Sequence, residues 1–305
     1  MFQKIDAGGI EGIMEIMAAA GVCKHPDPTL KLLQIAPVVS GTYTPQPRSG
    51  NEGKTQYPDT LDEYLELGYG LNAWGMPNPG FDAAARAFAG YEGDEPLIIS
   101  IAGETVDEYV EGVDLFSAIP GVSAIELNLG CPNTGKRIAS FDLTFIRNVL
   151  QVLGSLDAQE GKPIWVKLSP YADPYMLGEV ARTLRDFQDV VAAVVTCNTF
   201  PNAYHPDSGI AFNGGLAGLS GPALRPIALG QVVQFVRALK GTTIDVIGVG
   251  GIASYEDVFA FLKAGAVAVQ VNSRTSWGGD LKDFWDPLIR DGEGRILPFD
   301  EATED

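Results

Sequence analysis

A regular alternation of short apolar runs with longer amphipathic stretches is the feature that most constrains the fold. Apolar runs bounded by Gly and Pro are typical of buried strands, and stretches with helical spacing of apolar residues are typical of helices. Helix start signals precede some of these stretches, such as Asp173-Pro174 and Ser254 before Tyr255. The expected strands are Ile13–Ala19, Ile35–Val39, Leu97–Ile101, Ala124–Leu127, Ile164–Leu168, Ala192–Cys197, Ile244–Gly248 and Ala266–Val271. The expected helices are Pro28–Leu33, Thr105–Phe116, Phe141–Leu153, Pro174–Phe187, Pro222–Leu239, Tyr255–Ala264 and Leu281–Ile289.

Eight expected strands, each followed by a helix or a long connection, predict an α/β fold. The predicted architecture is a (β/α)8 TIM barrel with long loops over the mouth at the carboxyl ends of its strands. An open doubly wound sheet is the alternative. The length of 305 residues suits one such barrel, and 46% hydrophobic residues allow a large core. Because the sequence has no linker or low-complexity tract, we expect residues 1–305 to form a single domain.

Charge and cysteine usage narrow the possible partners and compartment. The formal net charge of −18 argues against nucleic acid and anionic membrane surfaces as partners. The three scattered cysteines lack metal-type spacing, so no metal site is expected and a reducing cytoplasm is the simplest compartment. Residues 1–10 lack the basic and apolar regions of a signal peptide, and no apolar run approaches the length of a membrane span. We therefore expect a soluble cytoplasmic protein.

Two segments between expected strands are too long and too polar to be simple connections. The first runs from Thr42 to Asn78 and ends in Asn-Ala-Trp-Gly-Met-Pro-Asn. The second runs from Thr199 to Ser220 and contains His205 and several glycines. Long ordered loops are usually functional, and in a barrel both segments would lie over the mouth.

The segment Ile125–Asn133 places polar groups at the end of the fourth expected strand. Pro132 stops the strand, so Asn128, Cys131 and Asn133 lie where the chain leaves the sheet. Ligands of parallel α/β proteins bind at that edge. A thiol between two carboxamides suits proton transfer beside a ligand held by hydrogen bonds. A buried structural cysteine beside two turn-forming Asn residues is the alternative.

Polar residues also end the next two expected strands. Lys167 lies in the otherwise apolar strand Ile164–Leu168, and Asn198 and Thr199 follow the sixth strand. A buried Lys needs an anionic or hydrogen-bonding partner, or else its pKa falls. A solvated Lys at the strand end is the alternative.

Glycine-rich turns follow the last expected strands. Gly248-Val249-Gly250-Gly251-Ile252 follows the seventh and Asn272-Ser273-Arg274 follows the eighth, with a third turn at Gly218-Leu219-Ser220-Gly221-Pro222. Phosphate-binding barrels place backbone N–H donors at such turns. The phosphate of flavin mononucleotide (FMN) fits this pattern, and so does a sugar phosphate.

In combination these motifs resemble the dihydroorotate dehydrogenase family. The resemblance covers roughly residues 14–278, and Cys rather than Ser at position 131 resembles the soluble class 1 enzymes. The segments that carry it are Asn72–Asn78, Glu126–Asn133, Val166–Pro170, Asn198-Thr199, Gly218–Gly221 and Gly248–Ile252.

The resemblance implies FMN at the barrel mouth and oxidation of dihydroorotate to orotate in pyrimidine biosynthesis. Cys131 would take the C5 proton, C6 would give hydride to flavin N5, and Lys167 would lie by the flavin N1/O2 edge and stabilise the reduced ring. A soluble electron acceptor and a homodimer are also implied. The residues implied to bind the pyrimidine are Asn72, Asn128, Asn133, Asn198 and Thr199. The residues implied to bind the flavin are Ala20, Gly21, Lys167, Gly221, Gly250, Gly251, Asn272 and Ser273.

The sequence departs from the family pattern at three places. Gly41 follows the second strand where the family has a Lys that meets the flavin and the orotate carboxylate, which leaves Lys136 and Arg48 as candidate replacements. Asn272-Ser273 stands where Gly-Thr is usual, and the family's N-terminal strand hairpin is poorly matched. Two alternatives therefore remain: an FMN-dependent enzyme acting on another dihydropyrimidine or an enone, and a flavin-binding paralogue without turnover.

Overall fold

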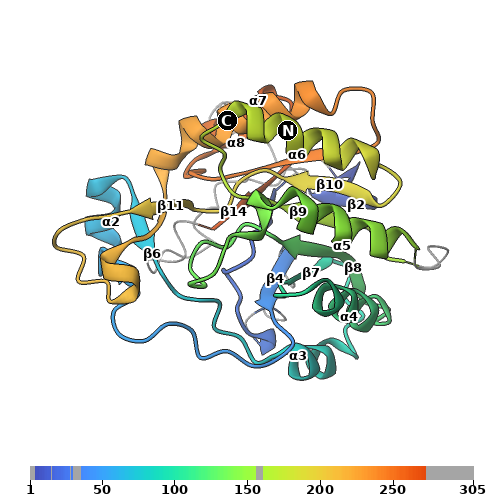
Figure 1. The fold of residues 1–305 in the computed structure, drawn as a ribbon, viewed down its shortest axis with the longest axis horizontal. Coiled ribbons are helices and arrows are strands. Elements are labelled where there is room, and N and C mark those ends of the chain that lie inside the picture. The colour runs from blue at the N-terminus through green and yellow to red at the C-terminus, as the bar shows by residue number, and fades with distance from the viewer. Residues whose placement is uncertain (1–3, 15, 28, 30–35, 156–160, 273–305) are drawn as a thin grey trace, which may run out of the picture.

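A closed barrel of eight parallel strands forms the centre of the computed structural model, which describes residues 4–14, 16–27, 29, 36–155 and 161–272 (Figure 1). The predicted barrel is therefore confirmed. Each strand is buried over most of its length because helices cover its outer face and side chains fill the interior. In order around the barrel the strands are β10 (Val191–Val195), β13 (Asp245–Val249), β14 (Ala268–Val271), β3 (Ile16–Ala18), β4 (Val38–Tyr43), β7 (Leu97–Ile101), β8 (Val122–Asn128) and β9 (Ile164–Lys167).

Helices connect successive strands, and polar caps explain where several of them begin. At the start of the helix Val106–Ser117, the Thr105 hydroxyl accepts a hydrogen bond from the backbone N–H of Glu108. Asp173 caps the helix Pro174–Asp186, which has Pro174 in its first turn. Ser254 and Asp257 form a capping box. The helices of the barrel are α3 (Phe81–Phe88), α4 (Val106–Ser117), α5 (Leu143–Ser155), α6 (Pro174–Asp186), α7 (Arg225–Ala238) and α8 (Tyr255–Lys263).

Several predicted boundaries are wrong in informative ways. The strand expected at Ile35–Val39 is observed as Val38–Tyr43, because Ser40, Gly41 and Tyr43 pair with β7 beyond the apolar run. The helix expected at Pro222–Leu239 is divided into a 3-10 turn, η4 (Pro222–Leu224), and α7. Another 3-10 turn, η1 (Ala139–Phe141), precedes α5. The expected helix Leu281–Ile289, and all but residue 29 of Pro28–Leu33, lie outside the described residues.

A β-hairpin lies against the amino-terminal end of the barrel, although sequence comparison matched this region poorly to the family hairpin. Strands β1 (Lys4–Ala7) and β2 (Ile10–Met14) pair antiparallel across Gly8 and Gly9, so the single strand expected at Ile13–Ala19 is divided between β2 and β3. Trp165 donates its indole N–H to the carbonyl of Gly8 at 2.7 Å, and Asp245 accepts the N–H of Gly8 at 2.7 Å. The hairpin is thereby fastened to β9 and β13.

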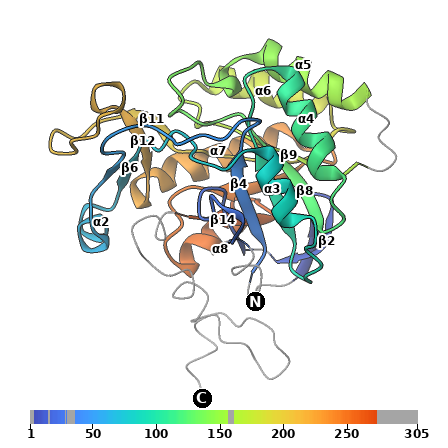
Figure 2. The same cartoon turned by 90° about the horizontal axis from the view of Figure 1, so that it is seen from below.

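The two long polar segments form a four-stranded antiparallel sheet beside the mouth (Figures 1 and 2). The first segment also contains helix α2 (Leu61–Leu67), which Thr60 caps and Gly68 ends at a φ of 70°. A small separate core of Leu71, Ala73, Ile210 and Ala217 holds the sheet together. Its strands, in order, are β11 (Phe200–Ala203), β12 (Ala217–Ser220), β6 (Gly70–Asn72) and β5 (Gln56–Tyr57), with the 3-10 turn η3 (Phe212–Gly215) between β11 and β12.

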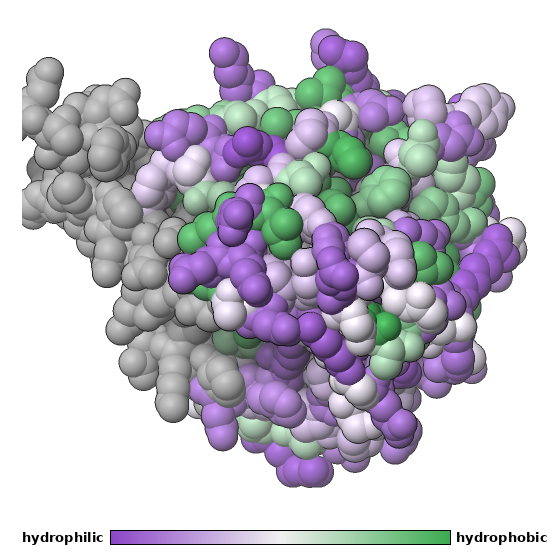
Figure 3. Space-filling view, turned by 90° about the vertical axis from the view of Figure 1, so that its left-hand side faces the viewer, coloured by the Kyte–Doolittle hydropathy of each residue, from purple (hydrophilic) through white to green (hydrophobic). Residues whose placement is uncertain are grey.

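The face on the side of this sheet is largely hydrophilic, with hydrophobic residues interspersed (Figure 3). Among the described residues, no helix has both the length and the hydropathy to cross a bilayer. The described part of the chain also contains no group of three or more His, Cys, Asp or Glu side chains placed to hold a metal ion.

Candidate active site

Two adjoining hollows lie at the carboxyl ends of the barrel strands. The first, the glycine hollow, is lined by Gly250, Gly251 and Asn272, and the second, the cysteine hollow, is lined by Cys131 and Asn133. The residues that line both hollows are Ala20, Asn72, Trp74, Lys167 and Asn198. The predicted site residues that line one or both are Ala20, Gly21, Asn72, Asn128, Cys131, Asn133, Lys167, Asn198, Thr199, Gly250, Gly251 and Asn272. Gly221 is not among the lining residues, and Ser273 lies outside the described residues.

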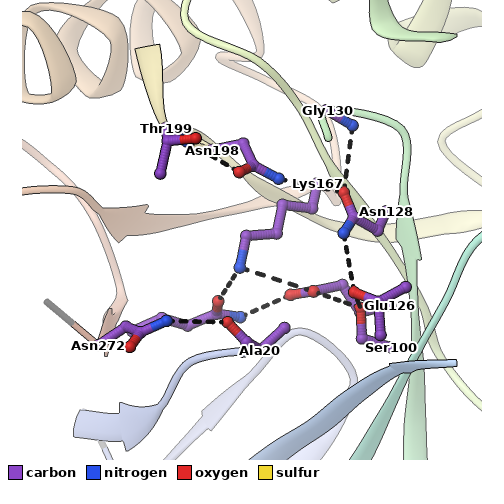
Figure 4. Close-up of polar contacts among 11 residues, drawn as sticks. Ala20, Ser100, Glu126, Asn128, Gly130, Lys167, Asn198, Thr199 and Asn272 are labelled. Carbon is purple, nitrogen blue, oxygen red and sulfur yellow. Dashed lines mark hydrogen bonds and ion pairs between the residues drawn. The ribbon is translucent and has the colours of Figure 1, made fainter. Parts of the chain in front are cut away.

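Lys167 stands on the floor between the hollows, inside a buried polar network (Figure 4). Its ammonium donates to the Gln270 side-chain oxygen at 2.9 Å and lies 3.7 Å from a Glu126 carboxylate oxygen. Gln270 in turn donates to Glu126 at 2.8 Å, and Ser100 donates to the same carboxylate at 3.0 Å. The partner that a buried Lys requires is therefore Glu126, and its charge balances that of Lys167.

Side-chain amides from β6, from β8 and the turn after it, and from the loop after β10 form hydrogen bonds around the two hollows. Asn128 donates to the Thr42 hydroxyl at 2.8 Å and accepts from Asn198 at 3.2 Å (Figure 4). Asn133 donates to the Asn72 side-chain oxygen at 3.1 Å, so the small sheet contributes one amide. Each carboxamide has two donors and two lone pairs, and these bonds leave part of that capacity for a ligand.

Cys131 lies half-buried in the turn after β8, beside Asn133. Burial raises the pKa of its thiol, while the backbone N–H of Asn133 and the charge of Arg48 partly offset the shift. Desolvation outweighs the stabilisation that these polar neighbours give to the thiolate. The Cys131 thiol therefore ionises less readily than an ordinary cysteine thiol.

The glycine turns bring two backbone segments into close contact. Gly250 and Gly251 have φ values of 120° and 75°, which residues other than glycine rarely adopt. A Cβ atom on Gly251 would lie 2.6 Å from the Arg225 backbone nitrogen and 2.7 Å from the Gly221 carbonyl. Gly221 therefore contacts Gly251 on the side away from the hollow, and this contact requires that residue 251 has no side chain. An ion pair between Arg225 and Asp257 stabilises the start of α7.

Thr199 carries a buried hydroxyl at the rim of the glycine hollow. Its side-chain oxygen has no hydrogen-bond partner among the described residues, although its backbone N–H donates to Asn198 at 2.8 Å. Because a buried hydroxyl without a partner is costly, this atom marks a place where a ligand can donate or accept.

Gly41 lines the cysteine hollow at a φ of 104°. A Cβ atom there would lie 2.7 Å from the Ser100 carbonyl oxygen, so a lysine side chain cannot be added at this position without moving the backbone. The candidate replacements for the family Lys are both occupied elsewhere. Lys136 forms an ion pair with Glu104, and an Arg48 guanidinium nitrogen lies 3.9 Å from the same carboxylate.

Sequence reasoning missed several lining or supporting residues. Glu126 and Gln270 lie in apolar strands, as Lys167 does, and the same requirement for a buried partner would have identified them. Lys24, which lines the cysteine hollow, follows the first barrel strand without any local motif. Trp74 lies within a segment already noted, but its role depends on the fold.

Comparison with known proteins agrees with this arrangement. A family model described as Dihydroorotate dehydrogenase matches residues 8–282. The catalytic subunit of dihydroorotate dehydrogenase B (NAD(+)) from Methanopyrus kandleri is 36% identical, over 82% of this chain and 76% of that protein. The subunit of the same name from Thermococcus kodakarensis is 32% identical, over 90% of this chain and 87% of that protein.

Solved structures resemble the fold. Ligand-free DHODH from Eimeria tenella superposes with a TM-score of 0.73 and 20% identity, over 95% of this chain and 90% of that one. The same enzyme in complex with ferulenol gives a TM-score of 0.72, also at 20% identity, over 88% and 79% of the two chains.

Proposed function

The chain belongs to the dihydroorotate dehydrogenase family of oxidoreductases, and from this premise we propose that it uses FMN to oxidise dihydroorotate to orotate in pyrimidine biosynthesis. The observation that carries the proposal is the meeting of the two hollows at Lys167. One hollow offers glycine turns suited to a phosphate, and the other offers a thiol among amides. A cofactor and a substrate could therefore lie in contact.

The residues of the glycine hollow fit FMN. Gly250 and Gly251 allow a phosphate close to the backbone, and Lys167 supplies a cation for an electron-rich ring edge. Thr199, whose hydroxyl has no partner among the described residues, also lines this hollow. Ala20 and Asn272 would complete the wall, and the next residue, Gly21, lines the adjoining cysteine hollow. Gly221 would lie behind this wall, and Ser273 follows Asn272 in sequence. FMN bound there would accept the hydride from C6 of the substrate.

Cys131 is the proposed general base. Its thiolate would take the C5 proton of dihydroorotate, so that loss of this proton and of the C6 hydride leaves the C5–C6 double bond of orotate. Removing such a base typically costs 10²–10⁴-fold in rate. The charge of Arg48, which partly opposes the rise in the Cys131 pKa, would assist ionisation of the thiol.

The five polar residues Asn72, Asn128, Asn133, Asn198 and Thr199 are proposed to bind the pyrimidine ring. A pyrimidinedione alternates donors and acceptors, and carboxamides can match both. Their mutual hydrogen bonds hold the side chains in place before the substrate arrives, which reduces the entropy lost on binding.

The relatives are named as catalytic subunits of an NAD(+)-dependent enzyme. We therefore propose that a second subunit takes electrons from the reduced chain and passes them to NAD(+). A homodimer of this chain in the cytoplasm would be the core of that assembly.

A second candidate substrate is a dihydropyrimidine without a carboxylate, because Gly41 replaces the family Lys. The test is anaerobic addition of dihydroorotate or 5,6-dihydrouracil to flavin-loaded protein, with the flavin absorbance followed near 450 nm, about where oxidised flavin absorbs. Bleaching by dihydroorotate supports the first proposal, and bleaching by dihydrouracil alone supports the second. A protein that takes up no FMN would contradict both.

A further inference from the structure

Lys24 follows the first barrel strand, in a segment that is fastened to the end of β4. The N–H of Gly21 donates to the Gly41 carbonyl at 2.8 Å, and the N–H of Gly41 donates to the Cys23 carbonyl at 2.9 Å. These two bonds hold residues 21–23 alongside Gly41. Lys24 consequently enters the cysteine hollow next to the position where β4 lacks a side chain.

The Lys24 ammonium lies over the ring of Trp74, 3.2 Å from its centroid. This cation–π contact fixes the position of a flexible side chain within the wall of the cysteine hollow. Burial lowers the pKa of Lys24 to about 8, because partial desolvation disfavours an unpaired ammonium.

The other cations near the site already have carboxylate partners. Glu126 balances Lys167, and Glu104 is shared by Arg48 and Lys136. Within the part of the chain that the structure describes, no carboxylate forms an ion pair with Lys24. Among the described residues, Lys24 is therefore the cation of the cysteine hollow whose charge is compensated by a ring face and not by a carboxylate.

We propose that Lys24 binds the carboxylate of the substrate in the cysteine hollow, in place of the side chain that Gly41 lacks. This inference rests on the proposed function and identifies its specificity-determining cation. A carboxylate beside Lys24 would acquire a fixed, partly desolvated partner, and the ammonium would regain the anion that its burial demands. A pyrimidine without the carboxylate would leave the ammonium uncompensated, so orotate is favoured over uracil.

The experiment titrates orotate and uracil into flavin-loaded wild type, Lys24→Met, Lys24→Gln and Lys24→Arg. Uracil is the matched ligand because it lacks only the carboxylate. A charged hydrogen bond of this kind corresponds to an affinity change of about 10- to 100-fold. We expect both neutral variants to lose that much affinity for orotate and less than about threefold for uracil, with Lys24→Arg retaining part of the preference.

Lys136→Met is the control, because Lys136 is exposed and paired with Glu104; it should bind orotate as wild type does. Flavin content and the thermal unfolding temperature establish that each variant is folded. If Lys24→Met does not fold, Lys24→Gln is the neutral variant that tests the proposal. Unchanged orotate affinity in a folded neutral variant, or equal losses for orotate and uracil, would overturn the assignment of Lys24 alone. A wild-type protein that binds FMN but not orotate would instead overturn the proposed function, and this inference with it.

Discussion

Burial acts on Cys131 and Lys24 in the same physical sense. It raises the pKa of the thiol and lowers that of the ammonium to about 8, because a low-dielectric site disfavours the charged form of either group. A ligand that brings an anion to Lys24 would favour the ammonium. The thiolate of Cys131 gains help from Arg48 and from the backbone of Asn133. The two groups line one hollow but serve different parts of the proposed substrate.

The first residue-scale prediction concerns Cys131. Cys131→Ala should slow flavin reduction by dihydroorotate about 10²–10⁴-fold, the usual cost of losing a general base, while FMN remains bound. Stopped-flow absorbance measures the rate. Cys23→Ala is the matched control, because Cys23 is a buried thiol that lines neither hollow, and it should reduce at nearly the wild-type rate. A wild-type rate in Cys131→Ala would make this cysteine structural.

The raised pKa of Cys131 predicts the pH dependence of the same step. The reactive form is the thiolate, so the rate of flavin reduction should rise with pH. Because burial places the thiol pKa above its ordinary value of 9.0, the rise should still continue at pH 9 rather than level off near neutrality. Single-turnover rates between about pH 6 and 10 give the profile. A plateau beginning below pH 7 would show that another group is the base or that substrate binding reverses the shift.

Glu126 carries the next prediction, because it is the buried partner of Lys167. Glu126→Gln leaves a buried ammonium without its counter-charge, and breaking such a pair typically lowers the free energy of unfolding by about 3–5 kcal/mol. Urea denaturation measures the loss. Glu104→Gln is the control, because Glu104 pairs with Lys136 while half-exposed and should change stability by no more than about 1 kcal/mol. Equal effects in the two variants would contradict a special role for burial.

At the scale of elements, the barrel strands could be located because they are buried on both faces and are rich in apolar residues, although the bounds of β4 could not be, since its second half is Ser40, Gly41, Thr42 and Tyr43. The small sheet could not be predicted, because β5 and β6 are only two and three residues long and β6 pairs with β12, which is distant in sequence. Helix α3 was missed because it is short and follows directly after the segment Thr42–Asn78, which was interpreted as a loop. Apolar periodicity therefore identifies the barrel but not the elements added to its mouth.

An element-scale prediction distinguishes β4 from an ordinary strand. Gly41→Ala should lower the free energy of unfolding by about 1–3 kcal/mol, because φ is 104° and the new Cβ would lie 2.7 Å from the Ser100 carbonyl. Gly41→Lys would meet the same clash, so adding the family Lys at this position should not improve ligand binding. The matched control is Gly178→Ala in α6, where nothing lies within 4 Å of the added Cβ and stability should rise by about 0.5–1 kcal/mol. Chemical denaturation of both variants gives the comparison, and a neutral Gly41→Ala would show that β4 can relax.

At the scale of the whole molecule, the sequence predicted which residues meet but not how they pair. Asn72 and Asn198 come from distant segments, and motif order placed both at the mouth because parallel strands end on one side. The partners of Lys167 could be identified only from the closed barrel, because Glu126 in β8 and Gln270 in β14 are far apart in the sequence. The position of Lys24 in the cysteine hollow could not be predicted either, because it depends on the hydrogen bonds between Gly41 and the segment that follows β3. Long-range register therefore limits what sequence alone can specify.

Net charge makes the last prediction a property of the whole chain. The sequence has 39 acidic and 21 basic residues, a formal net charge of −18, so carboxylates repel one another more in the compact state than in the unfolded chain. Salt shortens the screening length from about 10 Å at 0.1 M to about 3 Å at 1 M. The thermal unfolding temperature, measured with excess FMN, should therefore rise as the NaCl concentration increases, by about 2–4 °C for each kcal/mol of charge repulsion removed.

Two comparisons separate charge screening from a general effect of solutes on burial. Screening should account for most of the increase at lower salt, whereas exclusion of solutes from the protein surface continues to act at high concentration and is reproduced by sucrose. A double variant, Glu66→Gln with Glu111→Gln, removes two exposed negative charges and should unfold at a higher temperature in low salt with a smaller response to NaCl. An unfolding temperature that stays level or falls between low and high salt would show that the excess of carboxylates does not limit the stability of this fold.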